Sequence, residues 1–129
     1  MLNKFNPADI MPPYNNAYHH GVVIPPNGEV LHISGQVGAA ADGTTSPDPE
    51  EQSEQIWKNL AAILDGAGMT VANIVKLTAY IVSDDVYPAY AAVRNRYLGD
   101  IPPPASTAIF VPKLIMPEWL IEVEMIAAK

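Results

Sequence analysis

Apolar residues along this chain fall into short alternating or helically spaced runs, separated by clusters of proline and glycine. Residues 17–24 and 29–36 predict two strands, the second with apolar residues alternating at Leu31 and Ile33. The intervening Pro25-Pro26-Asn27-Gly28 predicts the turn of a hairpin, since Asn-Gly is a strong hairpin signal. Further strands are expected at residues 73–82, 105–111 and 119–127, with a short extra strand near Lys4-Phe5.

Two segments carry helix signals. The first starts at Asp48-Pro49-Glu50-Glu51, which supplies an N-cap, a proline for the first helical position and an acid where a capping box needs one. Apolar residues then recur at helical spacing until the glycines at positions 66 and 68. The second helix is expected to begin at Ser83-Asp84-Asp85, with Pro88 in its first turn, and to stop at Gly99.

The predicted order of elements is β-β-α-β-α-β-β, which indicates an α+β fold with one mixed sheet and both helices on one face. Residues 1–129 are expected to form a single domain, because the chain shows no linker and no internal repeat. The opposite face of the sheet is expected to carry apolar residues too. A small domain with two such faces commonly buries the second against copies of itself, so oligomerisation is expected.

Composition narrows the possible functions. Seven basic against fourteen acidic residues give a net charge of −7, which argues against a nucleic-acid partner. No apolar run approaches the ~20 residues of a membrane span, and the N-terminal residues do not resemble a secretory signal. We therefore expect a cytoplasmic protein. The absence of cysteine excludes disulfides and thiol catalysis.

The three histidines do not form a metal-binding pattern. His19 and His20 are adjacent on a predicted strand, so their side chains point to opposite faces and cannot easily share a metal. No acid lies at helical ligand spacing from either of them or from His32. We therefore predict that the protein has no metal site.

Three short patterns could carry chemistry, although each also has an ordinary structural explanation. Glu122 and Glu124 lie two apart on a predicted strand, so their carboxylates share one face, about 6–7 Å apart, and could act in acid/base catalysis or simply face solvent. Gly35 ends a predicted strand and could expose backbone to a ligand or permit close packing. Ser106-Thr107 opens a strand after three prolines and could bind a carboxylate or be an ordinary strand start.

Taken together, motifs along nearly the whole chain resemble the Rid family of enamine/imine deaminases, also called the YjgF or L-PSP endoribonuclease family. The matching motifs include Ile33-Ser34-Gly35-Gln36-Val37, Pro103-Pro104-Ala105-Ser106-Thr107 and Ile121-Glu122-Val123-Glu124-Met125. The resemblance implies a chorismate-mutase-like fold and a homotrimer with small-molecule clefts between subunits. It also implies cofactor-free hydrolysis of amino-acid-derived imines such as 2-aminoacrylate.

The resemblance also assigns site residues one by one. Tyr14 matches the family's cleft tyrosine, Gly35 the glycine whose backbone faces the ligand, and Thr107 a position whose backbone contacts the substrate. Glu122 matches the acid thought to hold or activate water. Ala105 departs from the pattern, because the deaminating members carry there an arginine that pairs with the substrate carboxylate. A second departure is Ala91, where many members carry asparagine.

These observations leave two main hypotheses and a weaker third. The first is a Rid-like hydrolase acting on a small enamine or imine other than 2-aminoacrylate, with Glu122 positioning water. The second is a non-catalytic Rid-like trimer that binds a small metabolite or a protein partner; the retained Glu122 favours the first hypothesis and Ala105 favours the second. Ribonuclease activity, suggested by the family's older name, fits poorly with the negative charge of the chain.

Overall fold

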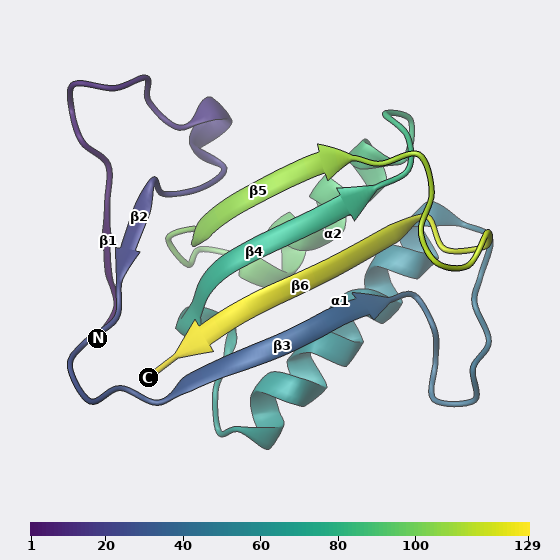
Figure 1. The fold of residues 1–129 in the computed structure, drawn as a ribbon, viewed down its shortest axis with the longest axis horizontal. Helices are drawn as coiled ribbons and strands as arrows, with labels where there is room; N and C mark the ends of the chain where they lie inside the picture. Colours follow the sequence, from purple (N-terminus) through teal and green to yellow (C-terminus); the bar gives the residue numbers. More distant parts are fainter.

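The computed structural model describes residues 1–129 and combines a four-stranded sheet, a two-stranded arm and two α-helices (Figure 1). The strands are β1 (Asn3–Phe5), β2 (Gly21–Val23), β3 (Val30–Val37), β4 (Ile74–Ile81), β5 (Ala105–Phe110) and β6 (Ile121–Ala128). The helices are α1 (Pro49–Gly66) and α2 (Tyr87–Leu98), with short 3₁₀ turns η1 (Tyr14–Asn16) and η2 (Val71–Asn73).

The main sheet has the strand order β3-β6-β4-β5, and both helices cover the same face of it (Figure 1). The β4 and β5 strands run parallel, while β6 pairs antiparallel with both β3 and β4. A parallel pair needs a long crossover connection, and α2 lies within the one that joins β4 to β5. The predicted α+β fold, with a mixed sheet and two helices on one face, is therefore confirmed.

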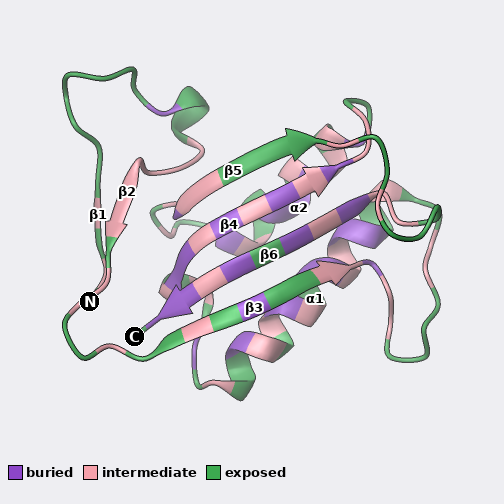
Figure 2. Cartoon of the chain, viewed as in Figure 1, coloured by how far each residue is buried: buried purple, intermediate pink, exposed green.

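The core lies between the sheet and the helices. Alternate residues of the two central strands point toward the helices, and Figure 2 shows this alternation as buried bands along β4 and β6. Trp57 of α1 is fully buried and stacks on Tyr97 of α2 with ring centroids 5.6 Å apart, which joins the two helices. Neither helix is both long enough and apolar enough to span a membrane.

The helix boundaries follow the sequence signals closely but not completely. Asp48 caps α1 by accepting a hydrogen bond from the Glu51 backbone at 2.9 Å, and α1 ends at Gly66 as expected. The Glu51 side chain does not complete the capping box, because Ser46 Oγ accepts from the Asp48 backbone instead, at 3.1 Å. The second helix begins at Tyr87 and not at residues 83–85, which form a turn before it.

The predicted hairpin between residues 17–24 and 29–36 is wrong. β2 pairs with the short strand β1, which confirms the expected strand at Lys4-Phe5, while β3 pairs with β6. Pro25-Pro26 explains the difference, because consecutive prolines donate no backbone hydrogen bonds and cannot extend a ladder up to the turn. Glu29 instead exchanges two backbone hydrogen bonds with Lys129, at 2.8 and 3.0 Å, beside the last residue of β6.

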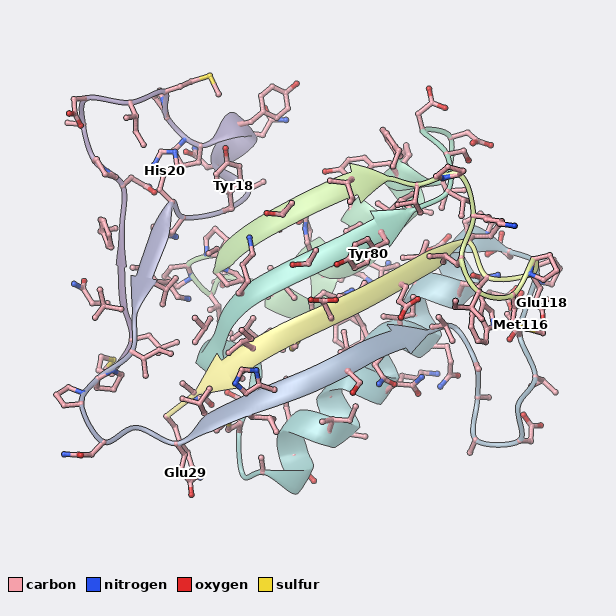
Figure 3. All side chains as sticks on the ribbon, viewed as in Figure 1. Tyr18, His20, Glu29, Tyr80, Met116 and Glu118 are labelled. Atoms are coloured by element: carbon pink, nitrogen blue, oxygen red, sulfur yellow. The ribbon has the colours of Figure 1, made fainter.

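The face of the sheet opposite the helices is more polar than predicted. On β4 it carries Lys76, Thr78 and Tyr80, which alternate with buried residues, and Figure 3 shows Tyr80 on this uncovered face. On β6 it carries Glu122 and Glu124. We call this surface the open face. Exposed large apolar residues lie in the N-terminal residues 1–23, at Val30, and at the end of β5 with the loop after it; this last group is Ile109, Phe110, Ile115 and Met116.

The side chain of Gln52 in α1 is completely buried and ties this helix to the segment that leads into β6. Its Nε2 donates to the carbonyl oxygens of Ser46 and Glu118, both at 2.8 Å, and its Oε1 accepts from the Leu120 backbone at 3.0 Å. A buried amide with three good partners fixes geometry strongly, because leaving any of these groups unpaired is costly.

We predict that Gln52→Met lowers the free energy of unfolding by about 1–3 kcal/mol, since it retains most of the volume but leaves three backbone groups without their partner. The matched control is Gln55→Met, one turn along, where the amide bonds only the Asn59 side chain and the loss should stay within about 0.5 kcal/mol. Urea unfolding of both variants measures the difference. Equal losses would show that the Gln52 network adds nothing specific.

Candidate functional site

Two of the sequence-predicted site residues, Glu122 and Gly35, meet on the open face. The pairing of β3 with β6 is irregular between Ile33 and Gln36, and Gly35 lies in this irregular stretch. A Cβ atom added to Gly35 would stand 2.0 Å from Glu122 Oε2, so the carboxylate occupies the space that any other residue would fill. Glycine at this position therefore lets the Glu122 carboxylate approach the β3 backbone closely. The packing explanation for Gly35 and its proposed site role thus concern the same contact.

The carboxylates of Glu122 and Glu124 differ in their hydrogen bonding. Tyr80 Oη donates to Glu124 Oε1 at 3.2 Å, whereas no donor of this chain is bonded to Glu122. The hydrogen bond to Glu124, aided by the negative charges of both glutamates, raises the pKa of Tyr80, so its hydroxyl keeps its proton at neutral pH. Glu122 is thus the glutamate left free to bind water or a ligand.

A shallow depression of about 500 Å³ surrounds these side chains, lined by Tyr80, Glu122, Glu124 and the loop residues Lys113 to Ile115. Sequence reasoning missed Tyr80 and its neighbour Lys76. Their spacing of two along a predicted strand was the available signal, because it places Lys76, Thr78 and Tyr80 on one face. The depression therefore combines two acids, a phenol and the ammonium group of Lys113, while Lys76 lies outside it on the same face.

Thr107 and Ala105 lie on β5, at the other edge of the open face. Lys76 Nζ donates to Thr107 Oγ1 at 2.6 Å, and Lys76 is also the residue paired with Ala105 in the β4–β5 register. Ala105 itself contributes no charge and no side-chain donor. The strands β4 and β6 lie between Thr107 and the Gly35 backbone, so neither β5 residue touches the Glu122–Gly35 contact.

Tyr14 lies apart from Glu122 within one chain. It belongs to η1, is 71% exposed, and lines two hollows that do not include Glu122. One is an apolar groove of about 310 Å³ shared with Tyr87, Ile109 and Phe110. The other is a cavity of about 350 Å³ between η1 and α2, which we call the η1–α2 cavity. A single chain therefore brings together only part of the predicted site.

Residues 1–23, which carry β1, η1 and β2 and which we call the N-terminal arm, are attached beside Ala105 through Pro103 and Pro104. The His19 backbone donates to the Pro104 carbonyl at 3.0 Å, and His19 Nδ1 lies 2.6 Å from the Pro103 carbonyl. His19 is thus engaged in holding the arm, while His32 is on β3. Nowhere in the chain do three histidine, aspartate or glutamate side chains gather in a way that could hold a metal ion.

The fold and the open-face acid define a small α+β protein of the Rid type, and comparison with known proteins agrees. The family described as Endoribonuclease L-PSP matches residues 10–129. The chain belongs to this family, which is the Rid or YjgF family.

Individual relatives extend the match. The RutC family protein YjgH of Escherichia coli is 34% identical over 86 residues, which cover 66% of this chain and 66% of YjgH. A RutC family protein of Aquifex aeolicus is 35% identical over 101 residues, 77% of this chain and 80% of the relative. The crystal structure of YyfB from Yersinia pestis, a Rid family protein of unknown function, has a TM-score of 0.86 and 34% identity, covering 99% of this chain and 98% of YyfB.

We predict that Gly35→Ala turns the Glu122 carboxylate away while leaving the fold intact. The new methyl group would overlap mainly the end of a flexible side chain, so the cost in stability should stay below about 1.5 kcal/mol. The measurement is the ¹³C resonance of the Glu122 carboxyl carbon, assigned with Glu122→Gln. It should move in Gly35→Ala and stay unchanged in the control Gly66→Ala, where an added Cβ meets nothing within 4 Å. An unmoved Glu122 resonance in Gly35→Ala would contradict the contact.

Proposed function

We propose that this protein hydrolyses a small enamine or imine without a cofactor, and that Glu122 positions the attacking water. The observation that carries the proposal is the free carboxylate of Glu122 held against the Gly35 backbone on the open face. Family membership adds the reaction class, because the resemblance to Rid proteins implies imine deamination.

Because an imine carbon is already electrophilic, the protein needs only to position the substrate and a water molecule for hydrolysis. Glu122 would accept a proton from water while the water oxygen attacks the C=N carbon, and the nitrogen would take up a proton to give a carbinolamine. Collapse of this intermediate breaks the C–N bond and releases ammonia and a carbonyl product. The balance is one imine and one water in, one carbonyl compound and one ammonia out.

Ala105 makes 2-aminoacrylate an unsuitable substrate in this proposal. The family's arginine would pair with the carboxylate directly next to the imine, whereas alanine provides no partner for a charge at that position. The same observation favours the alternative function, a non-catalytic trimer that binds a metabolite or a protein partner. The two alternatives differ in whether Glu122 is needed for turnover.

The proposed active unit is a homotrimer with a cleft between neighbouring subunits. Its support is the separation of Tyr14 from Glu122 within one chain, together with the exposed apolar Ile109 and Phe110 beside the Tyr14 groove. A second copy of the chain could bring Tyr14 toward the open face and cover these apolar side chains.

We predict that Glu122→Gln lowers imine hydrolysis roughly 100-fold or more, because an amide cannot take the proton from water. Ammonia release from a panel of neutral, anionic and aromatic imines measures this effect. Glu118→Gln, an exposed glutamate in the loop before β6, is the matched control and should keep full activity. A panel that is negative throughout, with Glu122→Gln the same as the parent, would favour the non-catalytic alternative.

We also predict that the parent chain leaves 2-aminoacrylate unprocessed, while Ala105→Arg gains that activity by restoring a bidentate partner for its carboxylate. The assay follows the loss of 2-aminoacrylate generated in place. Activity of the parent equal to that of Ala105→Arg would refute the role given to position 105.

The trimer predicts a mass in solution three times the 13.9 kDa of one chain. Light scattering during gel filtration measures it directly. Phe110→Glu should shift the mass downward, because it places a charge among the apolar side chains that association would bury. A parent mass of 13.9 kDa would overturn the trimer.

A further inference from the structure

The two arginines of the chain lie two residues apart on α2 and have opposite surroundings. Arg96 is exposed and pairs with Glu54 and, at 3.7 Å, with Glu50. Arg94 is only 6% exposed, and no carboxylate lies within ion-pair distance of it. An unpaired buried cation is expensive to maintain, so Arg94 calls for an explanation that Arg96 does not.

The protein satisfies little of the Arg94 guanidinium. Its Nε donates to Asn95 Oδ1 at 3.2 Å, and its carbon Cζ stands 5.7 Å from the centre of the Tyr90 ring. No carboxylate, carbonyl or amide oxygen of the chain accepts a hydrogen bond from the other four N–H donors of the side chain. The Tyr90 hydroxyl beside it is buried, and burial raises the pKa of Tyr90 to about 12 although the Arg94 charge acts in the opposite direction, so the phenol stays neutral and cannot serve as a counter-ion.

Arg94 lines the η1–α2 cavity of about 350 Å³, and it is the only charged residue that does so. No aspartate or glutamate borders the cavity, although the chain carries fourteen of them. Asparagine amides and tyrosine hydroxyls supply the other polar groups. Ala91, three residues before Arg94 and therefore on the same side of α2, also lines the cavity with a side chain that leaves space.

We infer that Arg94 binds the carboxylate of a small organic anion in the η1–α2 cavity. A guanidinium presents two parallel N–H groups to a carboxylate, and the low polarity around a buried side chain strengthens that pair. A volume of about 350 Å³ lies at the lower end of ligand pockets, which suits a small metabolite. The bound anion would supply the acceptors and the countercharge that the chain does not provide.

The substrate class that follows from this inference rests on the proposed function. The cavity contains Tyr14 and Ala91, two positions that the family resemblance associates with the cleft, together with Pro103 from the loop before Ala105. The positive charge therefore comes from α2 and not from residue 105. The substrate class is an anionic imine or enamine whose carboxylate lies farther from the C=N carbon than in 2-aminoacrylate and points toward α2, and its hydrolysis product is the corresponding oxo acid.

Lys76 is the rival cation, because it is paired in register with Ala105. Its ammonium group already donates to Thr107 Oγ1, and it lies on the exposed open face. A carboxylate there would compete with Thr107 and with water. The test must therefore separate Arg94 from Lys76 as well as from Arg96.

The experiment titrates the protein, residues 1–129, with pyruvate and levulinate, two oxo acids of different length, and with their neutral amides. Calorimetry gives the affinity, and ¹⁵N spectra of the arginine Nε–H groups identify the residue, because the chain has only two arginines and Arg96→Gln assigns their signals. At least one of the two acids should bind and shift the Arg94 signal in a saturable way, while its amide does not. Arg94→Gln should weaken that binding roughly 10- to 100-fold, with Arg94→Lys in between and Arg96→Gln unchanged.

The inference is overturned if neither acid moves the Arg94 signal, or if Lys76→Met abolishes binding while Arg94→Gln does not. The spectra of the parent protein decide the matter even if Arg94→Gln fails to fold. Binding is measured without turnover, so failure of this inference and failure of the proposed hydrolysis are told apart: oxo acids bound at Arg94 with no imine hydrolysed would remove only the catalytic claim.

Discussion

The buried amide of Gln52 holds α1 to the segment leading into β6, and the geometry of the open face depends on it. Through the Leu120 backbone it fixes the start of β6, two residues before Glu122. Because β6 lies between β3 and β4, this anchoring sets which residues stand next to Glu122. On one side Glu122 meets Gly35, and on the other it pairs in register with Tyr80. A purely structural contact in the helix layer thus determines where the carboxylate stands.

Carboxylate and cationic side chains lie at different places on the molecule. The open face holds Glu122 and Glu124, of which only Glu124 is engaged by a hydrogen bond from the chain. The η1–α2 cavity holds a single cation and no acid. A substrate with an imine group and a separate carboxylate has matching requirements, because the water needs a base and the carboxylate needs a guanidinium. In the proposed trimer, two subunits would supply these complementary halves to one cleft.

Local signals in the sequence were enough to predict most of the elements. Asp48 and Gly66 mark the two ends of α1, and the alternation in residues 73–82 matches β4. Pairing was less predictable, because it depends on contacts between distant segments. The Asn-Gly signal suggested a hairpin that Pro25-Pro26 prevents, and β3 reaches β6, some ninety residues further along, through a register that no local pattern encodes.

For the candidate site, too, the sequence predicted individual residues, whereas their contacts became visible only in the fold. Glu122 and Gly35 came from motifs, but their contact required the fold. Tyr14, Ala105 and Thr107 remain predictions, since one chain does not bring them to Glu122. The charge of Arg94 is evident in the sequence, whereas its burial without a carboxylate is not, because solvent exposure and missing partners exist only in three dimensions. For this reason the sequence indicated a missing cation at position 105, but it did not indicate that the arginine at position 94 is buried without a carboxylate.

A crystal structure of the assembled protein with a bound oxo acid tests the central claim most directly. The account predicts carboxylate oxygens within hydrogen-bond distance of the Arg94 guanidinium, with the oxo carbon turned toward the carboxylate of a Glu122. A carboxylate held by Lys76 or by the backbone near Ala105, with Arg94 donating only to protein carbonyls, would contradict it.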